Sequence, residues 1–173
     1  LKRAIELNPK YPSAYQWLAE VYHFSGNGDQ AISEINKAIE LDPLSMVINN
    51  QKGRVIDFGG KRDEAIAQFK KTSELFPDAA SPRNNLADVY EAKGMHPEAV
   101  EQRLIQIKLL FGVSAESIRD LQLAFEKDGY KGFLQKQIDI QLDNQRSSLE
   151  KDNNAYLPAF RIAEAYARLG DKD

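Results

Sequence analysis

The sequence predicts an all-α fold, an α-solenoid of antiparallel helix pairs with about ten helices. Three residue classes carry this prediction because each recurs at one constant interval: Pro9, Pro43 and Pro77; Gly26, Gly60 and Gly94; and Ala31, Ala65 and Ala99. Two further classes keep the same spacing, namely Leu7, Leu41 and Leu75, and Leu1, Ile35 and Phe69. An interval of about 34 residues is typical of stacked helix–turn–helix units. Two residues separated by this interval are described below as one repeat apart.

Each class has a physical role in such a unit. The glycines fall where the first helix must end, a position that favours a left-handed backbone. An acidic residue or a proline then begins the second helix, as expected for a first helical turn: Asp29, Asp63 and Pro97. The alanines are small because two helices approach closely there, and Pro43 and Pro77 end the second helix.

Residues 14–43, AYQWLAEVYHFSGNGDQAISEINKAIELDP, resemble a tetratricopeptide repeat (TPR) from end to end, and the resemblance covers residues 1–111. It implies a right-handed superhelix whose inner surface is lined mainly by the first helix of each repeat, a surface that solenoids use to bind partners. We expect a single array over 1–173. Its parts are the second helix of a preceding repeat (1–11), repeats at 12–45, 46–79 and 80–113, a degenerate repeat with a long second helix (114–155) and the first helix of a truncated repeat (156–173).

Beyond Phe111 the period loosens. We expect Ser114 to cap a helix that stops at Gly129, with a longer helix after it. Lys52 also departs from the pattern, in a place that is usually apolar, and we expect its stem to lie along the core with the ammonium in solvent. The segments GYKGFLQKQIDIQ and AYARLGDKD are similar to C-terminal TPR regions of bacterial multidomain regulators of the winged-helix, kinase or adenylate cyclase type. That likeness implies a regulatory parent protein.

The composition argues against several other classes of protein. The formal net charge is −3, from 23 basic and 26 acidic residues, which disfavours a nucleic-acid-binding surface. The chain has no cysteine and only two histidines, so we expect no metal site, no cofactor and no catalytic activity. No apolar run is long enough to enter a bilayer. We therefore expect a cytoplasmic protein, with the periplasm as the alternative.

The candidate binding residues lie on the first helices and face away from the packing seam between helices. They are Gln16, Glu20, His23 and Phe24 in one repeat, Asn50, Arg54, Asp57 and Phe58 in the next, and Asn84, Asp88 and Glu91 in the third; Phe160, Glu164 and Arg168 extend the series. Such a groove is modestly acidic, with amides and two phenylalanines. It would suit an extended peptide with basic or polar side chains and an apolar anchor.

Gln16 and Glu20 stand where TPRs that bind chaperone C-termini would need Lys and Asn, which disfavours that partner. Phe24 and Phe58 could anchor a peptide or cover a neighbour within the stack, and Glu20 could pair with Arg54 in a surface ladder worth little energy. A groove histidine such as His23 is more often a packing or surface residue than a ligand or a pH switch. We expect Trp17 and Tyr15 to pack between helices and His96 to be solvated.

We expect a protein or peptide partner, with another domain of the same parent chain as one candidate. The alternative is self-association as a homodimer. Leu1, Ile5 and Leu7 lack a preceding helix, and Ile162 and Tyr166 lack a following one. Uncapped apolar faces of this kind favour association.

Overall fold

The computed structural model describes residues 1–151, 166, 167, 169 and 170, with the side chains of 145, 146 and 148–151 excepted. In this part of the chain every regular element is a helix and no strand occurs, which confirms the all-α prediction. Eight helices are present there, close to the ten expected. The chain divides into two compact units, Leu1–Phe111 and Gly112–Asp173.

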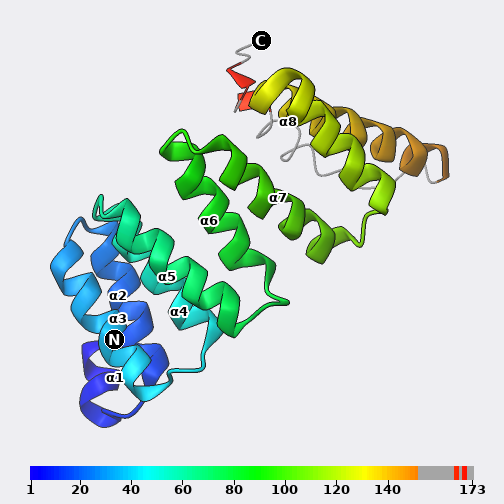
Figure 1. The fold of residues 1–173 in the computed structure, drawn as a ribbon. Helices are drawn as coiled ribbons and strands as arrows, with labels where there is room; N and C mark the ends of the chain where they lie inside the picture. The colour runs from blue at the N-terminus through cyan, green and yellow to red at the C-terminus, as the bar shows by residue number, and fades with distance from the viewer. Residues whose placement is uncertain (152–165, 168, 171–173) are drawn as a thin grey trace. The chain divides into compact units, whose positions relative to one another are not determined.

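The first unit consists of α1 (Lys2–Leu7), α2 (Pro12–Phe24), α3 (Gly28–Leu41), α4 (Met46–Phe58), α5 (Arg62–Leu75), α6 (Ala80–Ala92) and α7 (His96–Phe111). Successive helices pair as α2 with α3, α4 with α5 and α6 with α7 (Figure 1). Each pair packs on the next through α3 with α4 and α5 with α6. The first helices also contact one another, α2 with α4 and α4 with α6.

The turn inside each pair follows directly from the glycine class. Gly26, Gly60 and Gly94 have φ of 76°, 78° and 72°, the left-handed region that only glycine adopts at no steric cost. After each glycine the next backbone N–H donates to a carbonyl in the last turn of the first helix, for example Asn27 N to Tyr22 O at 2.9 Å and Met95 N to Tyr90 O at 2.9 Å. The first helix therefore ends at the same place in all three pairs.

Small residues bring the helices together and large apolar residues fill the space between them. Ala31, Ala65 and Ala99 are fully buried, as their class predicts. One apolar cluster consists of Tyr15, Ala19, Ile35, Ala38 and Ile48. A second, here called the Phe69 cluster, contains Ile56, Ala65, Phe69, Leu86, Val89, Tyr90 and Ala99. Because it draws on α4, α5, α6 and α7, it joins two helix pairs.

The second unit is described through α8 (Ala115–Lys151). Gly129 interrupts this helix with φ 64° and ψ −153°, where the sequence indicates a helix end. Leu121, Phe133, Leu134 and Ile138 are buried on either side of the break. The predicted loop after Lys151 and the groove residues Phe160, Glu164 and Arg168 lie outside the described residues.

Candidate protein-interaction surface

All the candidate residues of the first three repeats lie on α2, α4 and α6, the helices that contact one another. Two amide side chains fix the register between these helices. Gln51 Nε2 on α4 donates to Gln16 O on α2 at 3.2 Å, and Asn85 Nδ2 on α6 donates to Asn50 Oδ1 on α4 at 3.0 Å. The two donors are one repeat apart and so are the two acceptor residues, so equivalent positions are joined twice, once through a backbone carbonyl and once through a side-chain amide oxygen.

Aromatic side chains gather where α2 and α4 meet. The His23 ring lies 5.0 Å from the Phe24 ring and 4.3 Å from the Phe58 ring, between centroids. His23 is buried, whereas Phe24 and Phe58 are 70% and 59% exposed. The two phenylalanines therefore cover His23 and still present most of their surface to solvent. That exposure favours the anchoring interpretation over packing within the stack.

The charged candidate residues of α2 and α4 are Glu20, Arg54 and Asp57. Within the described residues, Glu20, Arg54 and Asp57 form no ion pair, so the ladder between Glu20 and Arg54 is not present. Burial lowers the pKa of His23 below its ordinary value, and the nearby Arg54 charge lowers it further against the opposing effect of Glu20. The His23 imidazole therefore binds a proton less readily than a free histidine does.

The candidate residues on α6 are instead engaged by one arginine of α7. Arg103 is 3% exposed, and its Nη1 donates to Asn84 Oδ1 at 2.6 Å. Its Nε and Nη2 donate to Glu91 Oε1 at 3.1 and 3.0 Å. Its Nη2 also pairs with Asp88. Gln106 Nε2 donates to Asn84 Oδ1 at 2.9 Å. We call these five residues the Arg103 network. It holds the polar groups of α6 against α7.

Arg103 was not predicted, although the sequence carries its signal. It stands one repeat after Phe69, in the class of Leu1, Ile35 and Phe69, where the other members are apolar. Burial disfavours its charge, but Asp88 and Glu91 outweigh that cost through charge and hydrogen bonding and raise the pKa of Arg103. A buried arginine needs such partners.

Four other side chains test predictions made from the sequence. Tyr15 is buried as expected, and its hydroxyl donates to Pro9 O at 3.1 Å. Trp17 is exposed, so the expectation that it packs between helices is wrong. His96 is half-buried rather than solvated, at the first residue of α7. Lys52 is half-buried, and burial followed by the Lys71 charge lowers its pKa, in keeping with a stem lying along the core.

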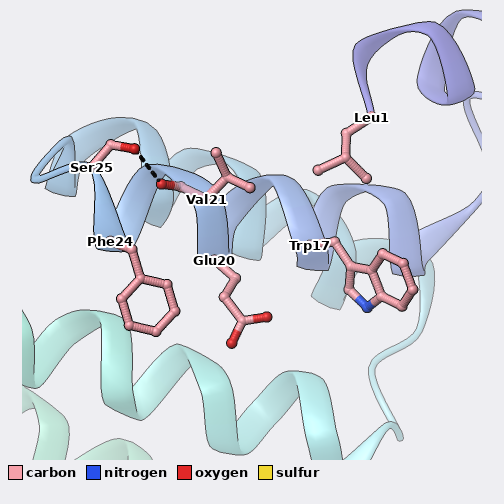
Figure 2. A pocket seen from close by; sticks show the side chains of 6 residues that line it. All are labelled: Leu1, Trp17, Glu20, Val21, Phe24 and Ser25. Carbon is pink, nitrogen blue, oxygen red and sulfur yellow. Dashed lines mark hydrogen bonds between the residues drawn. The ribbon is translucent and has the colours of Figure 1, made fainter.

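A pocket of about 480 Å³ lies on α2 beside the candidate surface, lined by Leu1, Trp17, Glu20, Val21, Phe24 and Ser25. Figure 2 shows Glu20 and Phe24 projecting from one side of α2, with Trp17 further along the helix. The Leu1 side chain points toward α2. Ser25 Oγ donates to Val21 O at 2.7 Å. Glu20 is thus the charged group of an otherwise largely apolar lining.

The described residues contain neither a cluster of three or more potential metal ligands nor a helix long and apolar enough to cross a membrane. The exposed features of the site are therefore aromatic rings, amides and a few charges. These groups bind other polypeptides through apolar contact and hydrogen bonding.

Comparison with known proteins finds repeat models and solved structures that are similar to these helix pairs. Two family models described as tetratricopeptide repeat match residues 1–33 and 56–107. Among solved structures, MamA MSR-1 C2 is 27% identical with a TM-score of 0.53, covering 62% of this chain and 62% of that one. TTC0263, a thermophilic TPR protein of Thermus thermophilus, is 26% identical with a TM-score of 0.59, covering 68% of this chain and 65% of that one.

The chain thus spans less than two thirds of the length of these two proteins. A further structure of MamA matches 84% of this chain and 86% of its own with a TM-score of 0.63; its 23% identity supports the fold alone. None of the curated proteins matches the sequence significantly. The two repeat models, the constant repeat register and the paired helices together support the tetratricopeptide-repeat family that the sequence resembles.

Proposed function

We propose that the chain is a protein-interaction scaffold that binds an extended segment of a partner protein along α2 and α4. The TPR family supports the general role, because stacked helix pairs present a continuous surface to partners. The binding place and the chemistry of the partner are proposed from the side chains of these two helices.

One observation carries the proposal, namely the unequal engagement of equivalent residues. Glu20 and Arg54 occupy the place that Asp88 occupies on α6, since the three follow one another at intervals of one repeat. Asp88 is paired with Arg103, while Glu20 and Arg54 form no ion pair within the described residues. The free charges of the surface are thus concentrated on α2 and α4, around exposed phenylalanines.

These groups suit a segment with a basic or polar side chain next to an apolar one. Glu20 and Asp57 offer carboxylates, and Phe24 and Phe58 offer apolar surface close to them on the same two helices. Aromatic side chains at the centre of an interface contribute most of its binding energy, and complementary charges set specificity. We therefore place the apolar anchor of the partner at the phenylalanines.

The test is capture of a partner from the source organism by the immobilised chain and by two matched triple variants. The groove variant carries Glu20→Ala, Asp57→Ala and Phe58→Ala. The control carries Glu40→Ala, Glu74→Ala and Leu44→Ala, which remove the same kinds of group, two carboxylates and one apolar side chain, from exposed positions outside the groove. A protein retained by the chain and the control but lost from the groove variant supports the proposal. Equal retention by both variants contradicts it.

Self-association is the second candidate function, and one observation favours it. The short helix α1 buries none of its residues, and Leu7 is exposed. Light scattering after size-exclusion chromatography would show a dimer that Leu7→Glu converts to a monomer. A monomer at all concentrations removes this candidate. The further idea that the scaffold is the regulatory part of a bacterial signalling or transcriptional regulator rests on the sequence likeness of its last segments and stays a proposal.

A further inference from the structure

Lys52 is the charged member of an otherwise apolar class. It stands one repeat after Leu18 and one repeat before Leu86, which are 7% and 1% exposed. Lys52 itself is half-buried on α4. Its methylene groups suit the apolar place that the two leucines occupy, but an ammonium group is costly to bury. The amine is therefore held at the boundary between the packed helices and the solvent.

The described part of the chain offers this charge no compensation. Lys52 forms neither an ion pair nor a hydrogen bond with any described residue. The charge that acts on it is the like charge of Lys71, which is exposed on the paired helix α5. Lys136 is half-buried as well, but its ammonium pairs with Asp120 at 2.9 Å. Among the described lysine side chains, Lys52 alone is half-buried without such a partner.

These surroundings favour the neutral amine of Lys52 over its ammonium ion. Burial, and then the Lys71 charge, lower the pKa of Lys52 below 10.5. At neutral pH a larger fraction of this side chain therefore carries a free electron pair than in an ordinary exposed lysine. The free amine is the nucleophilic form of lysine, and desolvation beside another cation is a known way to activate it. Because Lys52 is only partly buried, a small reagent can reach it from solvent.

Lys71 indicates the charge of the reagent that suits this place. It is exposed and forms no ion pair with the residues that the structure describes, so its ammonium group is free to attract an anion. A local positive charge raises the concentration of anionic reagents around it and does not do so for neutral ones. An acyl phosphate meets both conditions, because it combines an electrophilic carbonyl carbon with an anionic leaving group.

We propose that Lys52 is the preferred site of lysine acylation in this chain, with a small acyl phosphate as the donor and Lys71 as the residue that attracts it. The neutral amine attacks the carbonyl carbon, so that a C–N bond forms and the C–O bond to phosphate breaks. Inorganic phosphate leaves with the electron pair of that bond, and the nitrogen loses one proton to solvent. The amide that results is uncharged, so acylation removes the uncompensated charge from the apolar class.

The probe is acetyl phosphate at neutral pH, and peptide mass spectrometry measures the initial rate of acetylation at each lysine of the folded chain. Two lysines serve as internal controls, Lys136 as a half-buried and ion-paired side chain and Lys71 as an exposed and unpaired one. We expect Lys52 to react several-fold faster than either. The N-hydroxysuccinimide ester of acetic acid is the neutral comparison donor. It should still favour Lys52, but by a smaller factor, because Lys71 does not attract it.

Variants then separate the contributions of the two lysines. Lys71→Gln should slow the acetylation of Lys52 by acetyl phosphate and remove the difference between the two donors. Lys70→Gln makes the same change in net charge at the preceding exposed residue of α5, whose ammonium lies over the Tyr90 ring, and should leave both rates unaltered. Lys52→Met keeps an unbranched stem and removes the charge, as acylation does, so it should raise the midpoint of thermal unfolding. Lys70→Gln should not raise it.

Three results would overturn the proposal. The first is acetylation of Lys52 no faster than that of Lys136, and the second is an unfolding midpoint that falls in Lys52→Met. The third is an undiminished preference for acetyl phosphate in Lys71→Gln, which would remove Lys71 from the site. Lys52 is not among the groove residues, so none of these results bears on the proposed function, which partner capture by the groove variant tests by itself.

Discussion

Phe69 of α5 and Arg103 of α7 stand one repeat apart and fill the same place in successive helix pairs. Both are buried, at 1% and 3% exposure, but their surroundings differ in kind. Phe69 contributes to an apolar cluster drawn from four helices. Arg103 is surrounded by Asn84, Asp88 and Glu91 of its paired helix. The same geometry is therefore stabilised in one pair by apolar burial and in the next by a charged network.

The first helices of the two pairs also differ at the position of Gly53. Gly53 faces Phe69 so closely that a Cβ on it would lie 2.6 Å from Cδ1 and 2.7 Å from Cζ of the ring. The equivalent residue in the next pair is Ala87, which is fully buried. Space and charge are thus adjusted pair by pair, while the helix register stays constant. The difference teaches that the register constrains positions and not their chemistry.

The largest effect is expected from Arg103→Leu, which removes the cation and leaves Asp88 and Glu91 together without it. Breaking a buried ion pair from one side costs about 3 kcal/mol or more. We expect a loss of stability near about 3 kcal/mol and not above it, because the Asp88 side chain is 44% exposed. Urea denaturation followed by circular dichroism measures it. Adding Asp88→Ala and Glu91→Ala should recover most of the loss; no recovery would mean that the loss is one of packing alone.

Ala65→Leu tests the apolar pair of the comparison. Ala65 is fully buried in the Phe69 cluster, so the additional carbons of leucine have no space. Overpacking of this kind costs about 1–3 kcal/mol, and the loss should appear in the denaturation midpoint of the first unit. Ala67→Leu, at an exposed position on the same helix, is the control. A variant at Ala65 that melts like the parent would show that α4 and α5 do not approach closely there.

Gly53→Ala should destabilise the chain, against the usual effect of this change in a helix. Replacing a helical glycine by alanine ordinarily stabilises by about 1 kcal/mol. Here the new methyl meets the Phe69 ring, and overpacking costs about 1–3 kcal/mol. A net loss of stability by thermal denaturation is expected, and Phe69→Leu in the same chain should reverse the sign of the glycine substitution. Stabilisation by Gly53→Ala in the parent would contradict this packing.

The smallest effect concerns His23, which stands two repeats before Glu91, in the same place on its helix. Burial, and then the Arg54 charge, lower the pKa of His23 below 6.5 in the folded chain. The unfolded chain therefore binds the proton at higher pH than the folded chain does. The free energy of unfolding should fall as the pH drops through 6.5 toward the folded-state pKa, and then level off for this group. Denaturation midpoints above and below that window should differ less in His23→Leu than in the parent.

The fold could be predicted from the sequence because its determinants are local and repeated. Gly26, Gly60 and Gly94 end the first helices at left-handed positions, and Ala31, Ala65 and Ala99 mark the close approaches, each at the same interval. Gly129 similarly interrupts α8. These features depend on backbone conformation and side-chain volume, which a residue type states directly. The boundaries assigned to the individual repeats, especially beyond Phe111, remain predictions.

The candidate site could be predicted less completely, because engagement and exposure depend on neighbours. Asn84, Asp88 and Glu91 look like groove residues on α6 until Arg103 approaches from α7. Trp17 looks like a packing residue in the sequence, but its side chain is 58% exposed in the structure. The deviation of Arg103 from its apolar class was the available signal for the first. No pattern within α2 itself distinguishes Trp17 from a buried residue.

The Arg103 network also limits how this array can exchange parts. A graft that copied the apolar residue of α5 into α7 would leave two carboxylates in the neighbouring helix without their cation. A graft of the arginine into α5 would place a charge among Leu86, Tyr90 and Ile56. Recombination between these repeats can therefore preserve stability only when a crossover carries both helices of a pair. The helix pair, and not the single helix, is therefore the smallest unit of this chain that can be exchanged without breaking the Arg103 network.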